Sequence, residues 1–282
     1  MTRYAKPTTV DEALALLSQA GWRPLAGATD FYPAQGNRPI RENVLDLNGI
    51  AELRGISETD SHFVIGARTT WTDIQRTELP PAFDALKQSA REVGSVQIQN
   101  TGTVAGNLCN ASPAADGAPP LLILSAEVEL RSTRGARRLA LGDFILGNRK
   151  TARQSDELVT AFYVPREAAK GSSAFYKLGA RRYLVISIAM AAVRVIIEDR
   201  QIQRAAIAVG ACSAVAQRLR GLETALIGHE LAHAEAIIGA ATMPELAPIN
   251  DVRGSAEYRL DAAREIVQRV FDAISRPGKL AA

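Results

Sequence analysis

Two stretches rich in small residues have the composition of an anion-binding site. The longer one, residues 99–116 (QNTGTVAGNLCNASPAAD), combines Gly102 and Gly106 with several asparagines and alanines. Glycine and asparagine favour turns and left-handed backbone, so we predict an ordered loop rather than a helix, anchored to a core by Val104 and Leu108. A rigid glycine-rich backbone exposes N–H groups that suit a phosphate. Composition alone leaves open the alternative of a long loop that only turns a corner.

The shorter stretch, residues 26–30 (AGATD), also places small residues, a hydroxyl and an acid directly after an apolar segment. Two such segments in one domain could hold a diphosphate from two sides. Neither stretch matches the G-x-G-x-x-G pattern of dinucleotide-binding units or the G-x-x-x-x-G-K-[ST] pattern of P-loops. The two commonest phosphate-binding motifs are therefore excluded, whereas phosphate binding itself is not.

Two further patterns concern metals and redox chemistry. Residues 229–233 (HELAH) have the H-E-x-x-H spacing of zinc proteases, but Gly228 predicts a turn at the first histidine, and we interpret both histidines as surface residues. The two cysteines, Cys109 and Cys212, are too few for an iron–sulfur cluster. We interpret Cys109 as a small residue at a tight corner rather than a reactive thiol. If this chain transfers electrons, it does so through an organic cofactor, and we expect no metal site on it.

The elements that must position these stretches form three mixed parts. We expect a small α/β unit over residues 1–55, a second α/β unit over 56–168 and a third part over 169–282. The expected helices are 10–17, 72–76, 82–92, 121–124, 222–227, 231–241 and 255–274. The expected strands are 22–26, 44–47, 62–67, 128–130, 137–139 and 157–164, followed by three antiparallel strands over 174–178, 188–197 and 202–209.

The composition is that of a balanced globular chain. Its 282 residues are 47% hydrophobic, with 33 basic and 30 acidic side chains and a formal net charge of +3. This balance gives no indication of nucleic-acid binding. No stretch approaches the roughly 20 apolar residues of a membrane helix, and the N-terminal residues do not resemble a secretory signal. Together with two cysteines, these features lead us to expect a cytoplasmic location.

The strings at 26–30 and 103–116 resemble the two FAD-diphosphate loops of the flavin-binding medium subunit of molybdenum hydroxylases, the xanthine dehydrogenase and aerobic carbon monoxide dehydrogenase family. The resemblance runs nearly end to end and includes the string DVRGSAEYR at 251–259. It implies a two-part α/β FAD-binding domain of the PCMH type, followed by a C-terminal αβ domain. Ala28 and Ala105 stand where the family has paired glycines. An alanine there is tolerated at negative φ and costs about 1 kcal/mol at positive φ.

The resemblance also implies which residues contact the cofactor. Asp116 would bond ribityl or ribose hydroxyls, with capping of the following helix as the alternative role. Lys177 would give a cationic flavin contact, and the segment 183–186 would cover the ring, with Val185 where the family often has an acid. The implied cofactor-binding residues are Ala26, Gly27, Ala28, Thr29, Asp30, Gly102, Thr103, Val104, Ala105, Gly106, Asn107, Asp116, Leu158, Lys177, Tyr183 and Ile186.

The implied function is electron transfer, with no general acid or base on this chain. A large subunit with a molybdenum cofactor would oxidise the substrate, a small subunit would carry electrons through [2Fe-2S] clusters, and FAD here would pass them to an acceptor. The expected assembly is a heterotrimer or a dimer of heterotrimers. The alternatives are a self-contained FAD-dependent oxidase or reductase of the same superfamily and a non-catalytic α/β binding module. The sequence does not identify the substrate or distinguish NAD, oxygen and quinone as acceptors.

Overall fold

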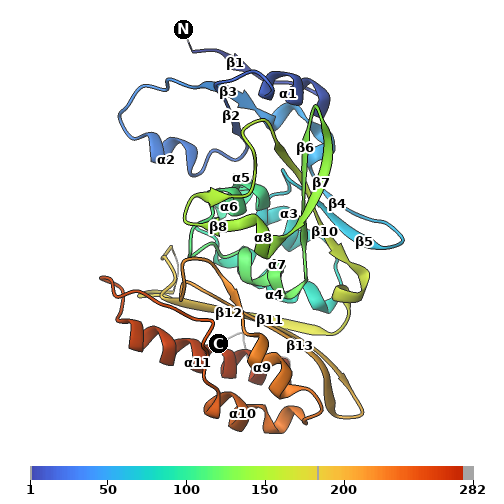
Figure 1. Ribbon diagram of the computed structural model, residues 1–282, viewed down its shortest axis with the longest axis vertical. Coiled ribbons are helices and arrows are strands. Elements are labelled where there is room, and N and C mark those ends of the chain that lie inside the picture. Colours follow the sequence, from blue (N-terminus) through green and yellow to red (C-terminus); the bar gives the residue numbers. More distant parts are fainter. Residues whose placement is uncertain (1, 183, 276–282) are drawn as a thin grey trace.

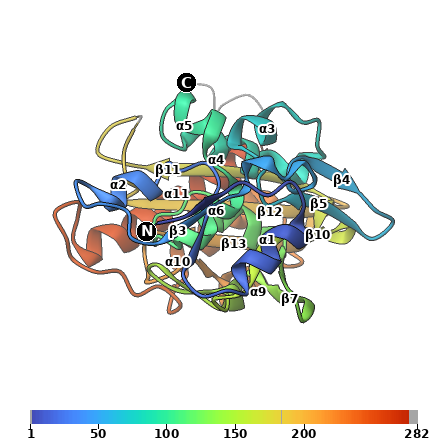
Figure 2. The same ribbon diagram turned by 90° about the horizontal axis from the view of Figure 1, so that it is seen from above.

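A small parallel sheet forms the N-terminal end of the molecule, whose computed structural model describes residues 2–182 and 184–275 (Figure 1). Its elements are β1 (Tyr4–Ala5), α1 (Val10–Leu17), β2 (Trp22–Leu25), α2 (Phe31–Gln35), β3 (Asn43–Asp46), and the 3-10 turns η1 (Leu47–Gly49) and η2 (Ala51–Leu53). The strand order is β1-β3-β2. Val44 and Leu45 point to opposite faces of β3, and α2 packs on one face and α1 on the other (Figure 2).

The central part is built on a five-stranded antiparallel sheet of order β4-β5-β10-β6-β7. The strands are β4 (Ile56–Glu58), β5 (His62–Gly66), β6 (Glu127–Ser132), β7 (Gly135–Ala140) and β10 (Leu158–Pro165). Ile65 and Phe162 of the sheet share one buried cluster with Trp71, Leu86 and Leu108 from helices that follow β5. The remaining elements are α3 (Trp71–Arg76), η3 (Pro81–Phe83), α4 (Asp84–Glu92), α5 (Val96–Thr101), α6 (Val104–Asn110), α7 (Ala118–Ile123), α8 (Leu141–Phe144), β8 (Ile145–Gly147), β9 (Lys150–Thr151) and η4 (Arg166–Ala169).

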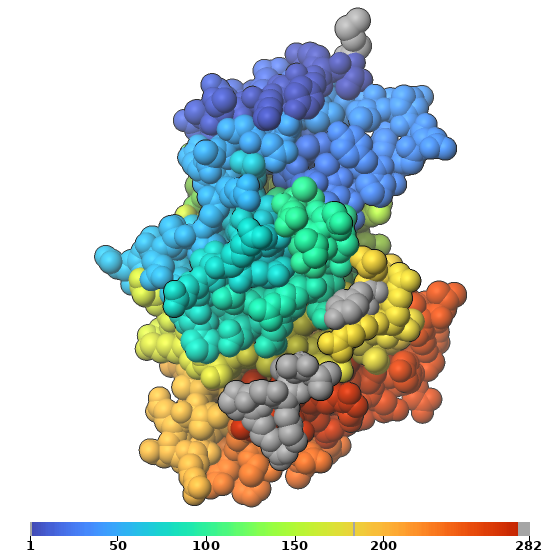
Figure 3. Space-filling model, turned by 180° about the vertical axis from the view of Figure 1, so that it is seen from behind, coloured from blue at the N-terminus to red at the C-terminus, as the bar shows by residue number. Residues whose placement is uncertain are grey.

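The C-terminal part places a four-stranded antiparallel sheet between two layers of helices. The strands are β11 (Ser172–Leu178), β12 (Ala189–Glu198), β13 (Gln201–Gly210) and β14 (Gln217–Arg218). Met190 and Ala192 pack into the central core, whereas Ala191 and Val193 pack against the C-terminal helices, as the alternation of a strand requires. Those helices are α9 (Arg220–Leu226), η5 (Leu231–His233), α10 (Ala234–Ala240) and α11 (Ala256–Ser275). The three parts therefore stack in chain order along the long axis (Figure 3).

The fold class is the expected one, but the prediction that residues 99–116 contain no helix is wrong. Within this stretch the backbone forms the end of α5 and all of α6. Thr103 caps α6, since its Oγ1 accepts a hydrogen bond from Gly106 N at 3.0 Å. Val104 and Leu108 are both fully buried, and Ala111 ends the helix with a φ of 48°. The cap and the burial of one apolar face outweigh the low helix propensity of glycine and asparagine.

Candidate functional site

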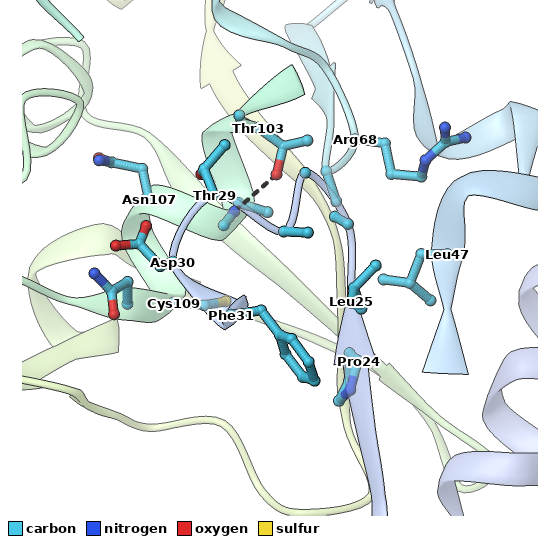
Figure 4. A pocket seen from close by; sticks show the side chains of 18 of the residues that line it. Pro24, Leu25, Thr29, Asp30, Phe31, Leu47, Arg68, Thr103, Asn107 and Cys109 are labelled. Carbon is cyan, nitrogen blue, oxygen red and sulfur yellow. Dashed lines mark hydrogen bonds between the residues drawn. The ribbon is translucent and has the colours of Figure 1, made fainter. Parts of the chain in front are cut away.

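A cavity of about 460 Å³ lies where the two small-residue stretches meet (Figure 4). The stretch 26–30 and the start of α2 form one wall, α5 and α6 form the opposite wall, and the start of β10 closes it. Its volume is in the range of small-molecule sites. The predicted residues that line it are Ala26, Gly27, Ala28, Thr29, Asp30, Gly102, Thr103, Ala105, Gly106, Asn107 and Leu158.

The first stretch presents unpaired backbone donors to this cavity. In the part of the chain that the structure describes, the amide N–H groups of Gly27, Ala28, Thr29 and Asp30 have no hydrogen-bond acceptor. Ala28 has a φ of 58°, and a left-handed residue within a run of amides is typical of the anion-binding concavities that backbone forms. Unpaired N–H groups are costly away from water or a ligand. This wall therefore fits an anionic group such as a phosphate.

Glycine is required where the two stretches cross. A Cβ on Gly27 would lie 2.1 Å from the carbonyl oxygen of Thr101, and one on Gly102 would lie 2.8 Å from the carbonyl oxygen of Ile98. Neither backbone oxygen can move without moving α5. The two alanines that stand where the family has glycines differ in backbone conformation. Ala28 has a strained positive φ, whereas Ala105 lies in α6 and is not among the residues with positive φ.

The second stretch does not offer the exposed amides that we expected. The N–H groups of Val104 and Ala105 donate to the carbonyl oxygens of Thr69 and Ala67, at 3.0 and 3.3 Å. Gly106 N donates to Thr103 Oγ1, and Asn107 N donates to Thr103 O at 3.1 Å. The amides of Val104 to Asn107 are therefore not exposed in the way we expected for residues 99–116, because the helix and the segment after β5 already use them. Among the described residues, only the Thr103 N–H of this group lacks an acceptor.

Cations gather around the cavity, and no sequence motif pointed to them. Arg23, Arg68, Arg149 and Arg153 line it together with Asp30. The Arg23 guanidinium lies 4.7 Å from the centre of the Phe31 ring. Positive charge around a concave site attracts anionic ligands. The four arginines share no spacing in sequence, and only Arg23 adjoins a predicted stretch.

Asp116 and Lys177 face each other rather than the cavity. Lys177 Nζ lies 3.0 Å from Asp116 Oδ1, with side chains 6% and 12% exposed, and also donates to Glu92 O at 3.2 Å. Ser187 Oγ bonds the same carboxylate at 3.4 Å. Burial raises the pKa of Asp116 to about 6, and the charge of Lys177 opposes the rise. The capping role for Asp116 is wrong, because Gly117 is the N-cap of α7 and no side chain caps that helix.

The remaining predicted residues lie apart from the cavity lining. Val104 is fully buried and does not line the cavity. Ile186 is 59% exposed and Leu184 is 54% exposed on the segment between β11 and β12. Tyr183 lies outside the described residues. The geometry thus brings together the residues expected around the diphosphate and Leu158, but not Asp116, Lys177 and Ile186, which were expected around the ribityl chain and the flavin ring.

The H-E-x-x-H string does not form a metal site. His229 lies in a turn and His233 in η5, so the two do not share one face of an α-helix. Among residues 2–182 and 184–275, no group of three or more histidine, cysteine, aspartate or glutamate side chains is arranged to hold a metal ion. No described helix combines the length and the apolar character needed to cross a bilayer.

Comparison with known proteins gives the class to which this fold and cavity belong. Residues 1–167 match the family profile described as the FAD binding domain in molybdopterin dehydrogenase, and residues 174–274 match that of the CO dehydrogenase flavoprotein C-terminal domain. The chain belongs to this family of FAD-binding medium subunits of molybdenum hydroxylases, and is thus an FAD-binding subunit of an oxidoreductase.

The relatives are subunits of several different enzymes. The nicotinate dehydrogenase FAD-subunit of Eubacterium barkeri is 36% identical over 70% of this chain and 69% of its own length. The nicotine 6-hydroxylase medium subunit of Paenarthrobacter nicotinovorans is 30% identical over 95% of both chains. The structure of carbon monoxide dehydrogenase from Hydrogenophaga pseudoflava superposes with a TM-score of 0.85 at 27% identity, covering 97% of each chain.

Proposed function

We propose that this chain receives electrons from iron–sulfur clusters on a partner subunit and passes them through FAD to an external acceptor. The relatives are FAD subunits and medium chains, names that belong to enzymes of several subunits. We propose a large molybdenum-cofactor subunit and a small [2Fe-2S] subunit as partners, in a heterotrimer or a dimer of heterotrimers. The free thiols of Cys109 and Cys212 are compatible with a cytoplasmic location.

One observation carries the assignment of the site: residues 27–30, whose four amides are unpaired, line a cavity surrounded by arginines. We assign the FAD diphosphate to this wall, opposite Gly102 and Thr103. Bound FAD supplies the redox chemistry. The residues of this chain bind the phosphates, hold the two walls in contact and limit the access of water.

The flavin-ring end of the site remains a proposal from the family resemblance. It assigns Lys177, Ile186 and Tyr183 to the ring, Asp116 to the ribityl or ribose hydroxyls and Leu158 to a backbone contact. Leu158 supports this extension, because it lines the cavity at the start of β10 and is 3% exposed. We also propose domain limits at 55/56 and 168/169, which fall between the three larger sheets.

The decisive experiment is to express the chain alone and with its partners, and to measure flavin content and turnover. We expect the isolated chain to retain about one FAD, seen by absorbance near roughly 450 nm, and to reduce no hydroxylase substrate. Turnover by the isolated chain identifies a self-contained oxidase or reductase instead. A chain that carries no flavin even with its partners contradicts the proposed function.

A further inference from the structure

A hydrogen-bonded cluster lies at the start of the first stretch and was not part of any predicted site. Asn48, which follows β3 in η1, donates from Nδ2 to the carbonyl oxygen of Ala26 at 2.9 Å. The same amide group donates to Asp46 Oδ1 at 2.8 Å. Its Oδ1 accepts a hydrogen bond from Arg68 Nη2 at 3.2 Å. Both ends of the Asn48 amide are thus engaged, and the orientation of the side chain is fixed.

Each neighbour of Asn48 is itself held in place. Asp46 is 7% exposed, and it accepts hydrogen bonds from the Tyr4 hydroxyl and from Asn48 N. Arg68 donates from Nη1 to Ile50 O at 2.6 Å, and it lines the cavity. Arg68 follows β5 in the central part, whereas Asp46 belongs to the N-terminal sheet. Asn48 therefore links two parts of the fold at the edge of the cavity, where Leu47 and Arg68 lie together (Figure 4).

The bond to Ala26 has a consequence for the next residue. A trans peptide unit is planar, and its C=O and N–H groups point in opposite directions. The chain has no cis peptide bond among the described residues. When Asn48 fixes the direction of the Ala26 carbonyl, it also fixes the Gly27 N–H, which is the first of the unpaired amides.

We propose that Asn48 is a positioning residue: it orients the Ala26–Gly27 peptide so that the Gly27 N–H is directed at the bound phosphate before the ligand arrives. Asp46 and Arg68 hold the Asn48 amide in the required orientation. Donors that are already oriented lower the entropic cost of binding, because less of the binding free energy is lost in ordering the loop. This inference rests on the proposed diphosphate site and adds a residue that does not itself contact the cofactor.

The test uses Asn48→Asp and Asn48→Ala in the full chain. Asn48→Asp retains an oxygen for Arg68 but has no N–H to donate to Ala26, and Asn48→Ala removes both links. We expect the Kd for FAD to rise about tenfold in each variant, the value of one ordinary hydrogen bond. Asn37→Ala is the matched control, because Asn37 is also exposed in the N-terminal part but, among the described residues, has no hydrogen bond to Ala26, Asp46 or Arg68.

A spectroscopic readout separates positioning from a general loss of stability. We expect the phosphorus NMR signals of bound FAD to shift in both Asn48 variants, whereas a change that only lowers the melting temperature of the flavin-free chain leaves the signals of bound FAD in place. Unchanged FAD affinity and unchanged phosphorus signals in Asn48→Asp overturn the inference, provided that Gly27→Ala still loses FAD. If Gly27→Ala also retains FAD with its original affinity, the proposed diphosphate site itself is wrong, and the positioning role falls with it.

Discussion

The two stretches that meet at the cavity are similar in composition and use their backbones differently. Residues 26–30 leave four amides unpaired, whereas Val104 to Asn107 donate all of theirs within the protein. The first stretch is open because it joins a strand to a short helix, and it comes close to another backbone at Gly27. The second is closed because α6 and the segment after β5 supply acceptors. Small residues thus serve ligand binding in one wall and close packing in the other.

Breaking the buried pair at the end of the second stretch should have the largest effect. Lys177→Met leaves the Asp116 carboxylate buried without its cation, and we expect a loss of about 3–5 kcal/mol in the free energy of unfolding. The double variant with Asp116→Asn should recover most of this loss, as measured by denaturant unfolding. FAD affinity that also recovers in the double variant indicates that the pair acts through structure. Affinity that stays low indicates a direct cofactor contact by Lys177, as the family resemblance implies.

The close crossing of the two walls gives the next largest effect. Gly27→Ala forces a methyl group against the Thr101 carbonyl oxygen, so we expect FAD affinity to fall by about 100-fold, equivalent to about 2.7 kcal/mol. In Gly106→Ala the methyl group meets Thr103 Oγ1 at 2.9 Å, so the side chain that caps α6 must shift slightly, whereas alanine itself favours the helix. We therefore expect the free energy of FAD binding to change by less than about 1 kcal/mol in Gly106→Ala, as measured by flavin fluorescence titration. Equal losses of FAD affinity in Gly27→Ala and Gly106→Ala would contradict the different roles that we assign to the two walls.

The pH dependence of stability gives a smaller effect for each pH unit. The pKa of Asp116 is raised from 3.8 to about 6 in the folded chain, so between these values the folded state binds more protons than the unfolded state. This group therefore makes the chain less stable as the pH rises from about 4 to about 6, by at most about 1.4 kcal/mol for each pH unit in that range. Asp116→Asn should lack this decline when urea unfolding is compared across the range. If the stability of the wild type relative to Asp116→Asn instead rises with pH, the charge of Lys177 lowers the pKa of Asp116 by more than burial raises it.

The smallest expected effect concerns the two alanines that replace family glycines. Ala28→Gly relieves a φ of 58°, and we expect it to stabilise the chain by about 0.5–1 kcal/mol with FAD affinity unchanged. Ala105→Gly, within α6, should destabilise it by a similar amount. Thermal unfolding of the two variants measures the difference. A stability loss in Ala28→Gly would show that the alanine methyl contributes packing that exceeds the strain.

Much of the fold followed from periodicity, and the exceptions have a common cause. The antiparallel strands around Phe175, Val193 and Ile207 are confirmed, since their β-branched and apolar residues alternate between two cores. The helix at 104–110 was missed because its stability comes from the Thr103 cap and from the burial of Val104 and Leu108. Those contributions depend on neighbours from β5 and α3 that lie far away in sequence.

Those parts of the site that are formed by residues close together in sequence could be predicted. The stretch 26–30 and Gly102 were identified from their own composition, and the structure places them at one cavity. The surrounding arginines, the Asn48 cluster and the pairing of Asp116 with Lys177 could not be predicted, because each joins residues from separate elements.

The sequence by itself determined most of the strands and helices and the two glycine-containing stretches, because propensity and the absence of a side chain act within a few residues. Only the tertiary structure decided which amides stay unpaired. An N–H group is free or engaged according to whether a distant carbonyl lies within about 3 Å of it, and that distance is set by the packing of the whole molecule.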